Sequence, residues 1–145
     1  MTKQFKISDS KPHQYAALCY RVKKSGVKVL LVTSRDTGRW VMPKGWPVKK
    51  QDGEGSAACE AWEEAGVVGK TDGKSIGCYR YDKVFDKNTA IECEVEVYPL
   101  EVTKLQKSYP ECKQRVRRWF SVTGAAKRVD EPDLAKLILR FTPNH

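Results

Sequence analysis

Three glutamates stand close together in the middle of the sequence, Glu60, Glu63 and Glu64. Residues spaced at i, i+3 and i+4 share one face of an α-helix, so these three carboxylates would project together. Like charges at this spacing destabilise a helix unless a cation compensates them. Mg²⁺ prefers carboxylate oxygens and completes its shell with water and substrate phosphates. The spacing therefore indicates either a magnesium site or a solvated acidic surface, and the helix alone leaves both open.

The element that would carry these glutamates is a helix over residues 53–65. Asp52 is a suitable N-cap, because its carboxylate can accept hydrogen bonds from backbone N–H groups one turn on. Gly66 stands where a left-handed C-terminal residue is favoured. We expect one side of this helix to pack inward, formed by Ala58, Ala61, Trp62 and Ala65. The three glutamates would then occupy the opposite, solvated side.

A segment rich in helix breakers precedes this helix. Residues 44–47 read Lys-Gly-Trp-Pro and follow Pro43, which predicts a loop. From Gly45 to residue 67 the glycines, the glutamates and a final valine are spaced in a way that resembles the Nudix box of Nudix hydrolases. That box reads Gly, five residues, Glu, seven residues, Arg-Glu, an aliphatic residue, any residue, Glu-Glu, any residue, Gly and an aliphatic residue.

Two positions depart from the box, because its first glutamate is Gln51 here and its arginine is Cys59. In the family these two positions usually pair in a salt bridge. Losing both partners together leaves no unpaired charge, so we interpret the change as a subfamily variant.

The resemblance implies an α/β protein with the Nudix fold, a mixed β-sheet sandwiched between α-helices. It also implies hydrolysis of a phosphoanhydride bond that depends on Mg²⁺, with Mn²⁺ as a substitute. By resemblance, Glu63 and Glu64 would be the principal metal ligands, and Glu60 a further ligand or the base that activates water. The backbone carbonyl of Lys44 would complete the metal shell. Glu111 is the candidate for an acidic residue that the family supplies from outside the box.

The resemblance extends over roughly residues 14–141. Outside the Nudix box, the sequence is similar to diphosphoinositol polyphosphate phosphohydrolases and their bacterial relatives. This similarity is carried by residues 15–35, 39–45 and 117–120. The implied substrate is a diphosphoinositol polyphosphate, a dinucleoside polyphosphate or a related nucleotide. The alternative, motivated by Gln51 and Cys59, is a catalytically weak module that binds a polyphosphate or an RNA 5′ end. RNA is less expected, because no basic stripe interleaved with aromatic residues is present.

The charge balance favours a polyanionic partner, since 27 Lys and Arg face 18 Asp and Glu for a net charge of +9. Among the basic residues, we predict that Arg35, Lys44 and Arg118 bind substrate phosphates. The residues that could stack on a ligand ring are Trp40, Trp46 and Trp119, although Trp119 beside Phe120 favours the core.

The length of 145 residues predicts a single domain over residues 1–145, with residues 1–13 as a loosely ordered polar segment. Strands are expected at residues 14–22 and 28–34 as a hairpin, at 39–42 as a short extended piece, at 91–97 and at 118–122, and a second helix at 134–141. Without an apolar signal or spanning segment, we expect a cytoplasmic monomer or homodimer with no membrane partner.

Overall fold

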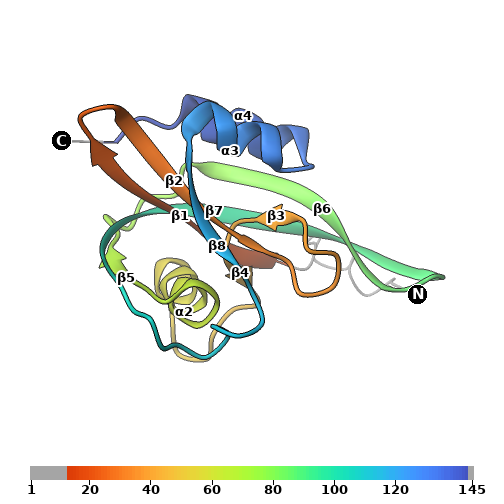
Figure 1. The fold of residues 1–145 in the computed structure, drawn as a ribbon. Coiled ribbons are helices and arrows are strands. Elements are labelled where there is room, and N and C mark those ends of the chain that lie inside the picture. Colours follow the sequence, from red (N-terminus) through yellow and green to blue (C-terminus); the bar gives the residue numbers. More distant parts are fainter. Residues whose placement is uncertain (1–12, 144–145) are drawn as a thin grey trace.

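The computed structural model describes residues 13–143, which form a mixed β-sheet with helices on both faces (Figure 1). The predicted α/β architecture is therefore confirmed. Residues 1–12 of the expected loose segment lie outside the described residues, but His13 is the first residue of a strand. Within residues 13–143, no helix is long and apolar enough to cross a membrane.

The elements follow one another as β1 (His13–Lys23), β2 (Gly26–Thr33), β3 (Trp40–Val41), β4 (Lys44–Gly45), α2 (Gly53–Ala65), β5 (Val67–Lys70), β6 (Gly77–Asp86), β7 (Thr89–Leu105), β8 (Arg117–Ser121), α3 (Val122–Arg128) and α4 (Pro132–Arg140). The predicted hairpin is confirmed as β1 and β2, which pair with Cys19 opposite Leu30. The alternating strand is confirmed within β7, where Cys93, Val95 and Val97 are buried. The closing helix is confirmed as α4.

Strand β1 lies in the middle of the sheet, antiparallel to β2 and parallel to β7, in the order β3-β2-β1-β7-β5. Strands β4, β6 and β8 pair with β1, β7 and β2 respectively. Because helices cover both faces of the sheet, residues 16–20 of β1 are all buried. Alternate side chains of this strand supply two separate cores. Ala16 and Leu18 face α3 and α4, whereas Ala17 and Cys19 face α2.

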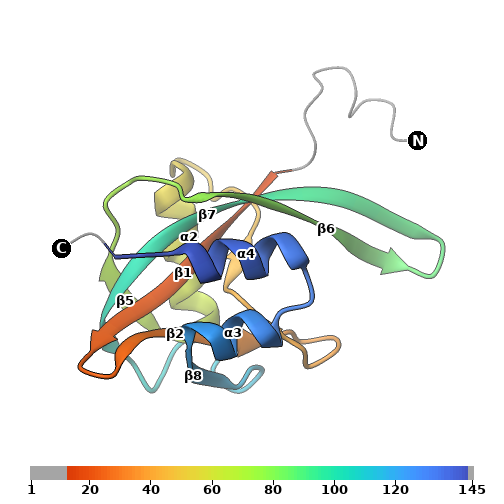
Figure 2. The same cartoon turned by 90° about the horizontal axis from the view of Figure 1, so that it is seen from above.

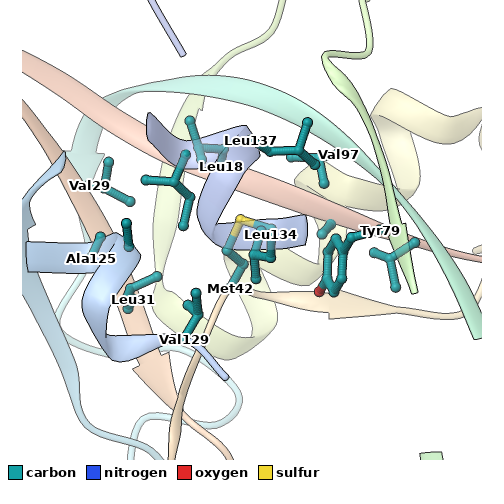
Figure 3. Packing of buried hydrophobic residues seen from close by; sticks show 14 of the residues in the cluster. Leu18, Val29, Leu31, Met42, Tyr79, Val97, Ala125, Val129, Leu134 and Leu137 are labelled. Atoms are coloured by element: carbon teal, nitrogen blue, oxygen red, sulfur yellow. The ribbon is translucent and has the colours of Figure 1, made fainter. Parts of the chain in front are cut away.

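The larger core lies between the sheet and the two C-terminal helices (Figure 3). Leu134, Leu137 and Ile138 of α4 are buried there, as the amphipathic pattern predicts. Met42, which follows β3, is fully buried in the same cluster. Its burial anchors the chain just before the loop that carries Gly45.

Helix α2 has the predicted bounds and caps, but not the predicted faces. The Asp52 carboxylate accepts from the Gly55 N–H at 2.8 Å, and Gly66 is left-handed with φ 66°. Trp62 was expected to pack inward and is 37% exposed, whereas Glu64 was expected in solvent and is only 6% exposed. Glu64 lies seven residues after buried Ala57, so the two side chains point in directions that differ by only about 20° around the helix axis. Glu64 is therefore on the buried face of α2.

Two further predictions about local structure are wrong. Lys44 and Gly45 are not wholly loop, because they form β4 and pair with Ala16 and Tyr15 of β1. Val122 does not end a strand. It begins α3, a helix that is not among the predicted elements, and the Ser121 hydroxyl caps this helix by accepting from Gly124 N–H at 3.0 Å.

Strands β6 and β7 form a long hairpin that extends beyond the rest of the sheet (Figures 1 and 2). Strand β6 was not predicted, although β7 was. The register places Tyr81 opposite Cys93 and Lys83 opposite Ile91, with an irregularity after Val84. The outer part of this hairpin borders the cleft described next.

Candidate active site

A cleft of about 620 Å³ opens between α2, the β4 loop, the β6–β7 hairpin and the turns that precede β3 and β8. Its charged lining residues are Arg35, Asp36, Arg39, Lys44, Glu60, Glu64, Asp82, Lys83, Glu111 and Arg115. The fold therefore brings together most of the site residues predicted from the sequence, although they come from segments far apart in the chain. Arg35, Lys44 and the carboxylates Glu60, Glu64 and Glu111 all line this one cleft.

The two helix carboxyls in the cleft wall, Glu60 and Glu64, are hydrogen-bonded to each other. Burial raises the pKa of Glu64 to about 8, and the hydrogen bond from Glu60 adds to the rise against the opposing charge of Arg115. Burial also raises the pKa of Glu60. The backbone N–H of Lys44 lies 3.4 Å from Glu64 Oε1. A bound cation would offset the negative charge that these two carboxyls carry when ionised.

Gly45 lies against the carboxyl group of Glu60. A Cβ atom at this position would overlap that carboxyl group, so any larger residue would displace it. The loop is held in place from both sides, because Ala17 N–H donates to the Pro43 carbonyl at 3.0 Å and β4 pairs with β1. The glycine therefore leaves room for the Glu60 carboxyl group beside the loop.

Beside the two helix carboxyls, the cleft lining contains an ion pair between Arg115 and Glu111. Arg115 Nε donates to Glu111 Oε1 at 2.7 Å, and Nη1 donates to the Thr33 carbonyl at 3.0 Å. Arg115 Nη2 also lies 3.8 Å from Glu64 Oε2, and the Arg115 side chain is only 10% exposed. Arg115 thus links the loop carboxylate to the helix carboxylate. We did not select it from the sequence, because no local pattern distinguishes it from the arginines around it.

Two predicted site residues are not brought into the cleft. Glu63 is exposed and does not line it, although its backbone carbonyl accepts from Glu111 N–H at 2.9 Å and so holds the Glu111 turn. The guanidinium of Arg118 lies 5.2 Å from the ring centre of Trp40, outside the cleft. Side chains alternate along β8, so Arg117 points to α2 and Arg118 to the other face of the sheet.

The sequence profile of the NUDIX domain matches residues 12–141. The chain belongs to the NUDIX domain family. Among solved structures, a NUDIX hydrolase from Nitrosomonas europaea superposes with a TM-score of 0.68 at 16% identity, covering 90% of this chain and 87% of that one. The Ap4A hydrolase of C. elegans gives a TM-score of 0.63 at 18% identity, covering 89% and 94%. These likenesses confirm the predicted Nudix fold.

The relatives by sequence include diphosphoinositol polyphosphate phosphohydrolases, as the resemblance suggested. The human 3-alpha protein of that name is 34% identical over 114 residues, which cover 77% of this chain and 65% of the human protein. The rat protein named diphosphoinositol polyphosphate phosphohydrolase 2 is 32% identical over 114 residues, covering 77% of this chain and 59% of the rat protein. The chain therefore spans less than two thirds of the length of these relatives.

The two departures from the Nudix box lie away from the cleft. Gln51 is exposed, and its side-chain oxygen lies over Gly55 in the first turn of α2. Cys59 is half-buried on the helix, and neither residue lines the cleft. Neither departure therefore changes a side chain that lines the cleft.

The oxygen ligands of this Nudix site fit a magnesium ion that is bound partly by the protein and partly by the substrate, rather than one that is bound by protein ligands alone. Within residues 13–143, no three His, Cys, Asp or Glu side chains are grouped so that they could hold an ion by themselves. Mg²⁺ is usually held by one or two carboxylates, with water and substrate phosphates as its other ligands. Glu60 and Glu64 supply such a pair of adjacent carboxyls, and Glu111 lines the same cleft. The residues thus fit an ion that is completed by the substrate.

Proposed function

We propose that this protein hydrolyses a phosphoanhydride bond in a diphosphoinositol polyphosphate, a dinucleoside polyphosphate or a related nucleotide, with Mg²⁺ or Mn²⁺ as cofactor. The observation that carries the proposal is the hydrogen-bonded pair of buried Glu64 and half-buried Glu60, which lies in the wall of a cleft that also presents basic side chains. Arg115 compensates only part of this acidic charge, because it lies 3.8 Å from Glu64 and also pairs with Glu111. Keeping this carboxyl pair close together therefore costs folding free energy. Its presence is explained if the pair serves a cation and a polyphosphate.

The cations of the cleft would bind the phosphate groups. The Lys44 ammonium lies 4.8 Å from the ring centre of Tyr81, and burial lowers its pKa to about 8, so it remains mostly charged at pH 7. Arg35 donates one hydrogen bond to Gln114 at 3.1 Å and is otherwise exposed to the cleft. Its remaining N–H groups could bind phosphate oxygens in a bidentate manner.

The carboxyls would bind the metal ion and accept a proton during the reaction. When bound, Mg²⁺ supplies positive charge that offsets the phosphate oxygens in the transition state. In this proposal Glu64 and Glu60 would bind that ion. The backbone carbonyl of Lys44 and the Glu111 carboxylate would be further ligands if the ion takes more protein ligands. Glu60, which is the less buried of the pair, is also suited to accept the proton of the attacking water.

The test is a substrate panel with and without Mg²⁺. Purified protein would be incubated with diphosphoinositol polyphosphates, dinucleoside polyphosphates and nucleoside triphosphates, and released phosphate or nucleotide would be measured. We expect turnover that requires the metal and that Glu64→Gln abolishes without unfolding the protein. If no compound in the panel is hydrolysed by folded protein at any metal concentration, the hydrolase proposal fails. Binding without turnover would instead favour the alternative of a binding module.

A further inference from the structure

Trp46 is an exposed aromatic residue at the rim of the cleft. It follows Gly45 directly, lines the cleft and is 42% exposed. No ring contact or cation–π contact within residues 13–143 involves its indole. An indole that faces a charged cleft without a ring partner offers a flat surface on which a base can stack.

The backbone around Trp46 is held in a defined position. The residue before a proline is restricted to extended conformations, and Pro47 imposes this on Trp46. The loop is tied to α2 by the Val48 N–H, which donates to the Ser56 hydroxyl at 2.9 Å. Ser56 itself is fully buried. The indole is therefore presented at the cleft by a constrained segment.

The other two tryptophans that could stack on a ligand have partners in the fold. Trp40 packs edge-on against Phe120, with 5.1 Å between the ring centres. The guanidinium of Arg21 lies 4.1 Å from the ring centre of Trp119. Neither Trp40 nor Trp119 lines the cleft. Of the three, Trp46 is the one that a substrate in the cleft could reach.

The charges of the cleft limit how many phosphates it can bind. Its basic and acidic residues are equal in number, five of each. Two of the basic residues are already paired, because Arg39 lies 2.8 Å from Glu131 and Arg115 lies 2.7 Å from Glu111. Arg35, Lys44 and Lys83 remain for the substrate. Three cations and a metal ion suit a short phosphate chain, whereas an inositol ring with phosphates on nearly every carbon needs many more.

We propose that Trp46 stacks on the nucleobase of a nucleoside or dinucleoside polyphosphate whose phosphate chain reaches Glu60 and Glu64. The inference rests on the proposed hydrolase function and narrows its substrate to the nucleotide class. The cation set binds the phosphates, and the indole supplies the affinity that distinguishes a nucleotide from a bare polyphosphate. Diphosphoinositol polyphosphates, which have no base, would be poorer substrates despite the sequence relatives.

The kinetic test compares diadenosine tetraphosphate with inorganic tripolyphosphate in the presence of Mg²⁺. For each protein the ratio of kcat/KM for the nucleotide to kcat/KM for tripolyphosphate is measured. We expect Trp46→Ala to lower this ratio about tenfold or more, and Trp46→Phe to restore most of it, because stacking tolerates a change of ring. Trp62→Ala is the matched control, since Trp62 is 37% exposed but does not line the cleft, and its ratio should equal that of the wild type.

A binding measurement separates this inference from the hydrolase proposal. ADP and inorganic tripolyphosphate are titrated into the wild type and Trp46→Ala, and the dissociation constants are measured by calorimetry without turnover. Tighter binding of ADP that is lost in Trp46→Ala supports base stacking, even if nothing is hydrolysed and the hydrolase proposal fails. An unchanged kinetic ratio in Trp46→Ala, equal affinity for the two ligands, or faster hydrolysis of a diphosphoinositol polyphosphate than of nucleotides overturns the inference and leaves the hydrolase proposal standing.

Discussion

Replacement of Glu64 by glutamine should make the metal-free protein more stable while it abolishes catalysis. Glu64 is 6% exposed, and burial raises its pKa from 4.5 to about 8. The folded chain binds a proton on the Glu64 carboxyl more tightly than the unfolded chain does. The contribution of this protonated carboxyl to the free energy of unfolding is therefore fully present below about pH 4.5. It is lost as the pH rises toward about 8. Glutamine has a similar shape and no charge to bury.

The magnitude follows from the linkage between protonation and folding. At pH 7 an unfolded Glu64 is ionised, and holding it protonated in the fold costs about 3 kcal/mol at about 1.36 kcal/mol per pKa unit. The variant loses the contact between Glu64 and Arg115 at 3.8 Å, which offsets part of that gain. We therefore expect Glu64→Gln to be more stable by on the order of 1 to 3 kcal/mol in EDTA, or several degrees in Tm.

The assay is thermal and urea unfolding of both proteins in EDTA from pH 5 to pH 8, repeated with Mg²⁺. The advantage of the variant should grow as the pH rises over this range, because only the wild type must keep a proton on this group. Added Mg²⁺ should stabilise the wild type and have little effect on the variant. If the variant is less stable than the wild type in EDTA at pH 8, or if the difference does not depend on pH, the reasoning about the buried carboxyl pair is refuted.

Substitutions at three other positions test the cleft and its surroundings. Gly45→Ala places a methyl group where the Glu60 carboxyl lies, so kcat should fall about tenfold or more with little change in Tm; an unchanged kcat would contradict this packing. Arg115→Met leaves the half-buried carboxylate of Glu111, which lies 2.7 Å from Arg115, without its ion-pair partner, and should reduce the free energy of unfolding in urea by about 2 kcal/mol. Arg115→Lys keeps the positive charge and should reduce this free energy by less. Equal losses in the two variants would show that charge at this position is unimportant. Glu63→Gln should retain more activity in steady-state kinetics than Glu64→Gln, because Glu63 does not line the cleft; equal losses would place Glu63 in the site.

Local patterns were enough to predict α2 and its ends. The cap at Asp52, the left-handed Gly66 and the i, i+3, i+4 spacing depend on residues within a few turns of one another, so the sequence alone determines them. The alternation in β7 and the β1–β2 hairpin are local in the same sense. The register of the Nudix box also needs no tertiary information, and it directed attention to Glu60, which does line the cleft.

The surroundings of each site residue were decided by contacts between segments that are distant in the chain. The parallel pairing of β1 with β7 positions the β6–β7 hairpin beside the cleft, and no local pattern predicts that pairing. The contact of Arg115 with Glu64 depends on how the turn before β8 folds against α2. Trp40 is partly buried because it packs against Phe120 of β8, whereas Trp46 has no such ring partner and stays exposed. Sequence spacing identified the glutamates, but only packing decided that Glu64 is buried and Glu63 is not, because burial depends on what covers each face of a helix.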